Sequence, residues 1–278
     1  MSRVLVSFSC GAASAVAAKM AVDKYGDRVE IIYCDTLKYE HPDNIRFLND
    51  VSAWVGKPIK IVSSPKYKDI FDVFEKTGWL VGNAGARCTL ELKRKPRKDY
   101  SRDGDTHVFG LTVDESERIA NFEDSNDIHV DWVLSKAGVT KKDCYRILQE
   151  AGIELPEMYK LGYNNNNCIG CVKGGQGYWN KIRVDFPEAF ERMAKLERKL
   201  NVAINKDRRG GKRRRLFLDE LDPEAGRDVP LPDIECGVMC VRPDGPADTV
   251  SIYDSILWEG GDHNDEEDQA SAKEVALA

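Results

Sequence analysis

The chain lacks any apolar run that approaches the ~18 consecutive residues needed for a membrane-spanning helix. The first residues, from Met1 to Ser7, lack the layout of a secretory signal peptide and lead directly into a β-branched, apolar stretch. We therefore expect a cytoplasmic location and no membrane partner.

Histidine is scarce. The four histidines lie at positions 41, 107, 129 and 263, and none is spaced from another like a pair of metal ligands. Cysteine is more abundant, with eight residues, and a reducing cytoplasm disfavours disulfides among them. The cysteines, rather than the histidines, are therefore the candidate ligands of a zinc ion or an iron–sulfur cluster.

The charge is unevenly distributed. Residues 259–278 carry seven acids and one base, which accounts for the whole formal charge of −6, and we expect this segment to be a disordered acidic tail. Within the balanced remainder, Arg87 to Lys98 contains six bases and one acid, and Lys206 to Arg215 contains seven bases and one acid. Each basic run is either a solvated face or a site for an anionic ligand.

Apolar strand-like segments alternate with amphipathic, helix-like segments through the first half of the chain. This alternation predicts an α/β fold, a parallel twisted sheet with helices on both faces, followed by an irregular helical C-terminal cap. We expect a nucleotide-binding domain over residues 1–130, a cap containing a cysteine cluster over 131–258 and the tail over 259–278. Strands are predicted at 3–9, 29–34, 59–62, 106–111 and 214–218, and helices at 14–25, 42–55, 67–77, 140–151 and 186–200.

The turn after the first predicted strand has the composition of a phosphate-binding loop. Gly11, Ala12 and Ala13 are small enough for an anion to approach the backbone, and a helix N-terminus follows at once. The hydroxyls of Ser7, Ser9 and Ser14 are further candidate donors. The loop matches neither G-x-x-x-x-G-K-[ST] nor G-x-G-x-x-G, so neither a Walker ATPase nor a dinucleotide enzyme is indicated.

These residues carry a resemblance to the PP-loop superfamily, and within it to the phosphoadenosine-phosphosulfate (PAPS) reductase-like proteins. The family's S-G-G-x-D-S loop is matched by Ser9 to Ser14, with Cys10 in place of a glycine and Ala13 in place of the aspartate. The resemblance spans roughly residues 3–200. Its other segments are Tyr33-Cys34-Asp35-Thr36 with Glu40-His41, Arg87-Cys88-Thr89 before Glu91-Leu92-Lys93, and Gly110 to Glu115 with Arg118.

The resemblance implies a PP-loop (HUP-like) fold that binds ATP or a sulfonucleotide. Asp114 is expected to act in catalysis, holding Mg²⁺ together with Glu115, while Arg118 neutralises phosphate. Asp35 is expected to contact adenosine or ribose. The full set of expected nucleotide-binding residues is Ser7, Ser9, Cys10, Gly11, Ala12, Ala13, Ser14, Asp35, Thr36, Gly110 and Arg118.

The cysteines at 168 and 171 form a C-x-x-C, a spacing that can chelate one metal ion or cluster. With Cys88 and one more cysteine near the C-terminus they would supply four thiolates, and the resemblance favours a [4Fe-4S] cluster over zinc. Cys236 stands in an E-C-G segment that resembles the one carrying the nucleophilic cysteine of sulfonucleotide reductases. We therefore expect Cys236 to be catalytic and Cys88, Cys168, Cys171 and Cys240 to bind the metal.

Two enzymatic mechanisms fit this framework. In the first, ATP adenylates an acceptor, and sulfide bound to the cluster displaces AMP; the basic segments would then hold a nucleic acid acceptor, and a sulfur donor is needed. In the second, Cys236 attacks the sulfur of a sulfonucleotide, and a reductant protein releases sulfite. Because of the extra cysteines and the basic run, the sequence favours ATP-dependent sulfur transfer. A non-catalytic nucleotide- or metal-binding protein is the third alternative.

Overall fold

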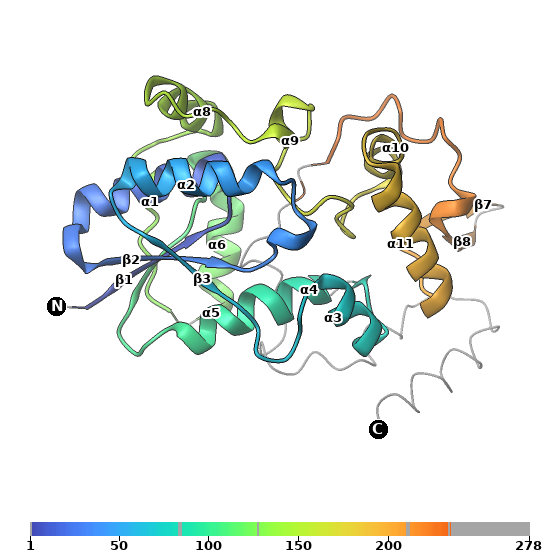
Figure 1. Ribbon diagram of the computed structural model, residues 1–278, viewed down its shortest axis with the longest axis horizontal. Helices are drawn as coiled ribbons and strands as arrows, with labels where there is room; N and C mark the ends of the chain where they lie inside the picture. Colours follow the sequence, from blue (N-terminus) through green and yellow to red (C-terminus); the bar gives the residue numbers. More distant parts are fainter. Residues whose placement is uncertain (1, 83–84, 127, 210–211, 233, 235–278) are drawn as a thin grey trace.

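A four-stranded parallel sheet forms the centre of the computed structural model, which describes residues 2–82, 85–126, 128–209, 212–232 and 234. The strand order is β3-β2-β1-β6 (Figure 1). The predicted α/β fold with a parallel sheet is confirmed. The strands are β1 (Val4–Phe8), β2 (Val29–Cys34), β3 (Ile59–Val62) and β6 (Thr106–Val108).

The two central strands are buried because their side chains are apolar on both faces. Val4 of β1 lies opposite Val29 of β2 and Thr106 of β6. The edge strand β3 is less covered, and the side chain of Ile61 is 49% exposed. Continuous apolar runs in the centre and a more polar edge are typical of a parallel sheet between two helical layers.

The direction of the strand order reverses beside β1. The chain moves from β1 to β2 and β3 on one side, and then returns to place β6 on the other side of β1. In open α/β sheets, ligands bind in the crevice outside the carboxyl ends of the strands at such a switch point. The topology therefore directs attention to the loops that follow β1 and β6.

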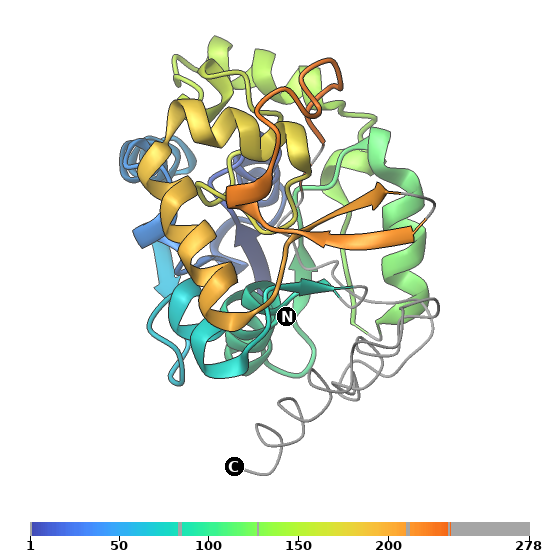
Figure 2. The ribbon, with the colours of Figure 1, turned by 90° about the vertical axis from the view of Figure 1, so that its right-hand side faces the viewer.

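Helices cover both faces of the sheet, with α1 and α2 on one side and α5 on the other (Figure 1). The cap lies beyond the carboxyl ends of the strands, where α10, α11 and the β7–β8 hairpin are found (Figures 1 and 2). The helices are α1 (Ala12–Tyr25), α2 (Asp43–Val55), α3 (Ile70–Thr77), α4 (Arg87–Thr89), α5 (Lys95–Tyr100), α6 (Ser116–Ser125), α7 (Val133–Lys136), α8 (Lys141–Glu150), α9 (Glu157–Lys160), α10 (Gln176–Asp185) and α11 (Pro187–Leu200).

Two short antiparallel pairs complete the regular structure. One joins β4 (Val81–Gly82) to β5 (Gly85–Ala86), and the other joins β7 (Asn205–Arg209) to β8 (Lys212–Leu216). Short 3₁₀ turns lie at Gly26–Arg28, Leu37–Tyr39, Val113–Glu115 and Leu218–Glu220.

One helical path runs from Arg87 to Tyr100 and contains a π-helical turn over Leu90–Arg94 between α4 and α5. Pro96 follows this turn. Its missing N–H cannot bond to the carbonyl of Leu92 four residues earlier, and its ring crowds that carbonyl, so a widened turn relieves the conflict.

The apolar clusters do not follow a single boundary along the sequence. Val133 and Leu148 pack with the sheet and α1, whereas Val73 and Phe74 of α3 pack with the cap helices α10 and α11. The division at residue 130 stays a prediction, and the predicted tail lies outside the described residues. Of the helices described, none combines the length and the hydropathy that a bilayer crossing demands.

The loop after β1 contains a backbone conformation that favours glycine. Cys10 has φ of +56° and is fully buried among the residues of the sheet core. A left-handed conformation costs an L-residue roughly 1–2 kcal/mol. The sulfur fills core space, so Cys10 combines backbone strain with a packed side chain.

We expect Cys10→Gly to be more stable than Cys10→Ala by about 1 kcal/mol, because both lose the sulfur and only alanine keeps the strained Cβ. Urea denaturation of the two variants measures this difference directly. Equal stability of the two variants, or a more stable alanine variant, would show that residue 10 is not left-handed in solution.

Candidate functional site

A cavity of about 270 Å³ opens at the carboxyl ends of β1 and β6, where the topology reverses. Its walls come from the loop after β1, the ends of β2 and β6, the helical path 87–100, and two cap segments. The lining residues are Ser7, Phe8, Ser9, Gly11, Ala12, Ala13, Ser14, Tyr33, Cys34, Lys93, Arg97, Phe109, Gly110, Leu111, Thr112, Asp114, Glu115, Arg118, Lys141, Tyr159, Asn165, Asn166, Asn167 and Ile234.

Ser14 fixes the shape of the loop. Its hydroxyl donates to the carbonyl of Gly11 at 2.9 Å and accepts from the backbone N–H of Ser9 at 3.1 Å. The hydroxyl of Ser9 also donates to Ser14 Oγ at 3.2 Å. The Ser14 proton is therefore directed at the loop itself, and Ser14 holds the loop in place rather than offering a free donor.

The N-terminus of α1 faces this cavity through Ala12, Ala13 and Ser14. The first N–H groups of a helix have no acceptor within the helix, and the helix dipole favours an anion there. In this structure the N–H of Ala12 donates to the hydroxyl of Tyr159 at 3.4 Å. Tyr159 thus covers the start of α1 from the opposite wall.

Gly110 allows the segment after β6 to pass close to α1. A Cβ at this position would lie 2.5 Å from the backbone nitrogen of Ser14 and 2.6 Å from its Cα. Only glycine fits between these two backbones. The approach places both switch-point loops on the same cavity.

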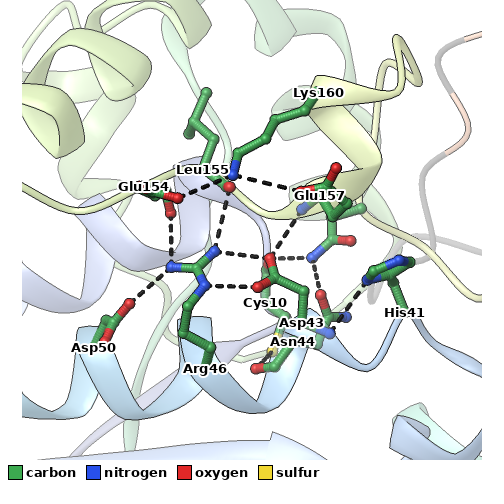
Figure 3. Close-up of polar contacts among 11 residues, drawn as sticks. Cys10, His41, Asp43, Asn44, Arg46, Asp50, Glu154, Leu155, Glu157 and Lys160 are labelled. Atoms are coloured by element: carbon green, nitrogen blue, oxygen red, sulfur yellow. Dashed lines mark hydrogen bonds and ion pairs between the residues drawn. The ribbon is translucent and has the colours of Figure 1, made fainter.

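Arg46 of α2 holds the segment that carries Tyr159. It donates to the carbonyls of Glu154 and Leu155 at 3.2 and 3.3 Å while pairing with Asp43 (Figure 3). Asp43 in turn accepts from the backbone N–H of Glu157 at 3.0 Å. The start of α9 is therefore fixed on α2.

A buried series of hydrogen bonds joins the asparagine-rich loop, residues 164–167, to the loop that follows β1. The amide nitrogen of Asn166 donates to the carbonyl of Cys10 and to Asn44 Oδ1, both at 2.7 Å. Asn44 donates to Glu40 at 2.7 Å, and Glu40 accepts from Thr36. Asn165 Oδ1 and Asn166 Oδ1 are buried without a hydrogen-bond partner, so the cavity presents two available acceptors here.

The carboxylates of the cavity already have partners. Glu115 accepts from the backbone N–H and hydroxyl of Thr112 at 2.9 and 3.1 Å and pairs with Arg118. Asp114 accepts from the backbone N–H of Lys141 at 3.1 Å at the start of α8. Both acids therefore serve as caps of helical segments.

The cavity includes most of the predicted nucleotide-binding residues and omits three. Ser7, Ser9, Gly11 to Ser14, Gly110 and Arg118 line it, whereas Cys10, Asp35 and Thr36 do not. Asp35 accepts from the hydroxyl of Ser63, and Thr36 is buried against Glu40.

Several lining residues were absent from the predicted site. They include Lys93 and Arg97 from the basic run, Lys141, Tyr159, Asn165 to Asn167 and Ile234. The basic run 87–98 was the sequence signal that marked part of this set.

The C-x-x-C forms a tight turn within the cap core, where Cys168 and Cys171 are buried and Cys88 packs against the same cluster. Burial raises the pKa of Tyr178 well above its ordinary value, so its hydroxyl stays protonated. That hydroxyl donates to the carbonyl of Cys168 and accepts from the N–H of Cys171.

Over the described part of the chain, no group of three or more histidine, cysteine, aspartate or glutamate side chains is placed to hold a metal ion. Cys236 and Cys240 lie outside the described residues. Cys88, Cys168 and Cys171 do not complete a metal site by themselves, and the cluster stays a prediction.

No model of a known protein family matches this chain, and no curated protein matches it. Among solved structures, the fold is similar to that of a phosphoadenylyl-sulfate (PAPS) reductase from Candida auris in complex with phosphate. The two share 15% sequence identity, with 60% of this chain and 82% of that chain covered and a TM-score of 0.45. A likeness this distant says nothing of activity.

We expect Gly110→Ala to destabilise the protein by about 1–3 kcal/mol, because the added Cβ forces the N-terminus of α1 away from β6. Thermal unfolding measures the loss. Gly175→Ala is the matched control, since a Cβ there meets nothing within 4 Å. Equal stability of the two variants would refute the close approach.

Proposed function

We propose that this cavity binds an adenine nucleotide and that the chain is a sulfonucleotide reductase. The proposal rests on one observation: at the switch point, the N-terminus of α1 lines the same cavity as four cationic residues, Lys93, Arg97, Arg118 and Lys141. Such a wall suits the phosphate and sulfate groups of a nucleotide. The unpartnered oxygens of Asn165 and Asn166 suit the amino group of adenine or the hydroxyls of ribose.

The hydrogen bonds of Asp114 and Glu115 favour a ligand that binds without Mg²⁺. A triphosphate usually arrives with Mg²⁺ held by a carboxylate, yet Asp114 and Glu115 are used as helix caps. The position of the family's loop aspartate is Ala13. The cavity therefore favours the sulfonucleotide alternative over ATP-dependent sulfur transfer, which reverses the order suggested by the sequence.

Ile234 connects the cavity to the E-C-G segment. It lines the cavity, and its carbonyl accepts from the side chain of Asn167. Cys236 follows Ile234 by two positions in the sequence. This supports the assignment of Cys236 as the nucleophile.

The proposed reaction has two steps. The Cys236 thiolate attacks the sulfur of the phosphosulfate, the bond from that sulfur to the bridging oxygen breaks, and the nucleotide phosphate leaves with the electron pair. A dithiol of a reductant protein then attacks the Cys236 sulfur, releases sulfite and is oxidised to a disulfide. The enzyme thiol is regenerated.

ATP-dependent sulfur transfer is the second candidate, because the C-x-x-C follows directly on cavity-lining asparagines. Asn165 to Asn167 line the cavity, and Cys168 comes next in the chain. A [4Fe-4S] cluster on Cys88, Cys168, Cys171 and Cys240 would supply thiolate-bound iron beside the nucleotide. The basic hairpin β7–β8 would then contact a nucleic acid acceptor.

We expect anaerobically prepared protein to release sulfite from an adenosine phosphosulfate in the presence of a protein dithiol. Cys236→Ser should lower the rate at least about 1000-fold because it removes the attacking thiolate. Cys144→Ser, in the sheet core, is the control and should retain sulfite release. Pyrophosphate release from ATP would favour sulfur transfer, and nucleotide binding with neither product would favour a non-catalytic protein.

We expect the same preparation to contain about four iron and four sulfide per chain, as in Cys-ligated cubane clusters. Cys168→Ser and Cys171→Ser should each lower the iron content, while Cys144→Ser, in the sheet core, should leave it unchanged. Stoichiometric zinc, or a protein without metal, would contradict the cluster assignment.

A further inference from the structure

Arg97 is a buried cation in the wall of the cavity. Its side chain comes from α5 and is only 8% exposed, and its Nε has no hydrogen-bond partner. In the described parts of the chain, no carboxylate pairs with it. A buried charge without a counterion is costly, so the protein retains this arginine at the expense of stability.

The groups around Arg97 do not neutralise it. Its guanidinium carbon lies 5.2 Å from the centre of the Phe109 ring; besides burial, the Cys34 thiol acts to raise its pKa and the charge of Arg94 acts to lower it. Burial lowers the pKa of Arg97 to about 10, which leaves it protonated at neutral pH. Burial, with a contribution from Arg97 itself, lowers the pKa of His107 to about 4, so that histidine is neutral.

Ser7 contributes a second unpartnered donor on the same side of the sheet. Side chains alternate along β1, and Val4, Val6 and Phe8 face α1, so Ser7 faces the layer of α5. Its hydroxyl is buried without a partner and lines the same cavity as Arg97 and Lys93. Cys34, at the end of β2, donates to the carbonyl of Lys93 at 3.4 Å, which places β2 against this helical path.

We propose that Ser7, Lys93 and Arg97 form a second anion-binding subsite on the α5 side of β1, which takes a phosphate or sulfate group of the ligand. The proposal rests on the nucleotide site proposed above and deepens it. The first subsite is the N-terminus of α1, on the other side of the end of β1. The ligand class is therefore a nucleotide with two separate anionic groups, one for each subsite.

The subsite also gives the basic run a specific use. Lys93 and Arg97 are four residues apart on one helical path and both line the cavity, whereas Lys98 is exposed and does not. Within one basic run, two cations therefore line the cavity, while a third, Lys98, is exposed to solvent. This provides a matched pair of residues for an experiment.

The test uses the full-length chain and three variants, Arg97→Met, Arg97→Lys and Lys98→Met. The probes are inorganic phosphate, inorganic sulfate and adenosine 3′,5′-bisphosphate, each titrated by calorimetry, with thermal unfolding followed in buffer without these anions. We expect Arg97→Met to weaken bisphosphate binding about tenfold or more, Arg97→Lys to restore part of the affinity, and Lys98→Met to match the wild type. Comparing phosphate with sulfate shows which group the subsite prefers.

Thermal unfolding separates a binding role from a structural one. We expect Arg97→Met to unfold at the same temperature as the wild type or higher, because it removes an uncompensated buried charge. A lower unfolding temperature with unchanged affinity for every probe would overturn the subsite and leave Arg97 a core residue stacked on Phe109.

The two proposals fail in distinguishable ways. If the wild type binds phosphate or sulfate in an Arg97-dependent manner but binds no adenine nucleotide, the subsite stands and the proposed function fails. If the wild type and Arg97→Met bind the nucleotide equally well, the nucleotide site stands and the subsite is refuted.

Discussion

The arrangement of the candidate site depends on the side-chain amide of Asn166, which is buried and therefore needs hydrogen-bond partners. Asn166 is 5% exposed, and its amide group bonds to the carbonyl of Cys10 and to Asn44. Leaving such donors unpaired would cost about 1–3 kcal/mol each, so the asparagine-rich loop, the turn after β1 and helix α2 are held in one arrangement. This contact places the asparagine-rich loop over the carboxyl end of β1, where it forms one wall of the cavity. The left-handed Cys10 is part of the same constraint, because its carbonyl must point toward Asn166.

The resulting cavity has two chemically different sides. Lys93, Arg97 and the unpartnered hydroxyl of Ser7 lie on the α5 side, while the asparagine loop offers the acceptors Asn165 Oδ1 and Asn166 Oδ1. A ligand with anionic groups at one end and N–H or O–H donors at the other complements this polarity. The carboxylates, which would repel such anions, are fixed as helix caps by backbone N–H groups.

Much of the sheet could be predicted from the sequence, because strand and helix periods differ strongly in segments such as 29–34 and 42–55. The turn between β1 and α1 could also be located, since small residues stand between a buried strand and an alanine-rich helix; phosphate binding by this turn stays a prediction. The role of Ser14 could not be predicted, because the sequence does not distinguish a hydroxyl that holds the loop from one that binds a ligand. The basic run 87–98 shows that cations are present without showing which of them line the cavity; in the structure Lys93 and Arg97 do. The roles of Asp114 and Glu115 depend on which backbone N–H groups lie nearby, and that is a tertiary property.

The hydroxyl of Tyr159 has a consequence for affinity. It already accepts from the N–H of Ala12, at the place where an anion would meet the start of α1. A phosphate oxygen that takes this N–H must displace the tyrosine, so binding is an exchange of one hydrogen bond for another. An anion bound there would gain only the difference between the two, about one hydrogen bond or ~1 kcal/mol less than the helix terminus alone could provide. Because Arg46 fixes the segment before Tyr159 on α2, that competition is built into the fold, and occupancy of the loop is coupled to the position of α9.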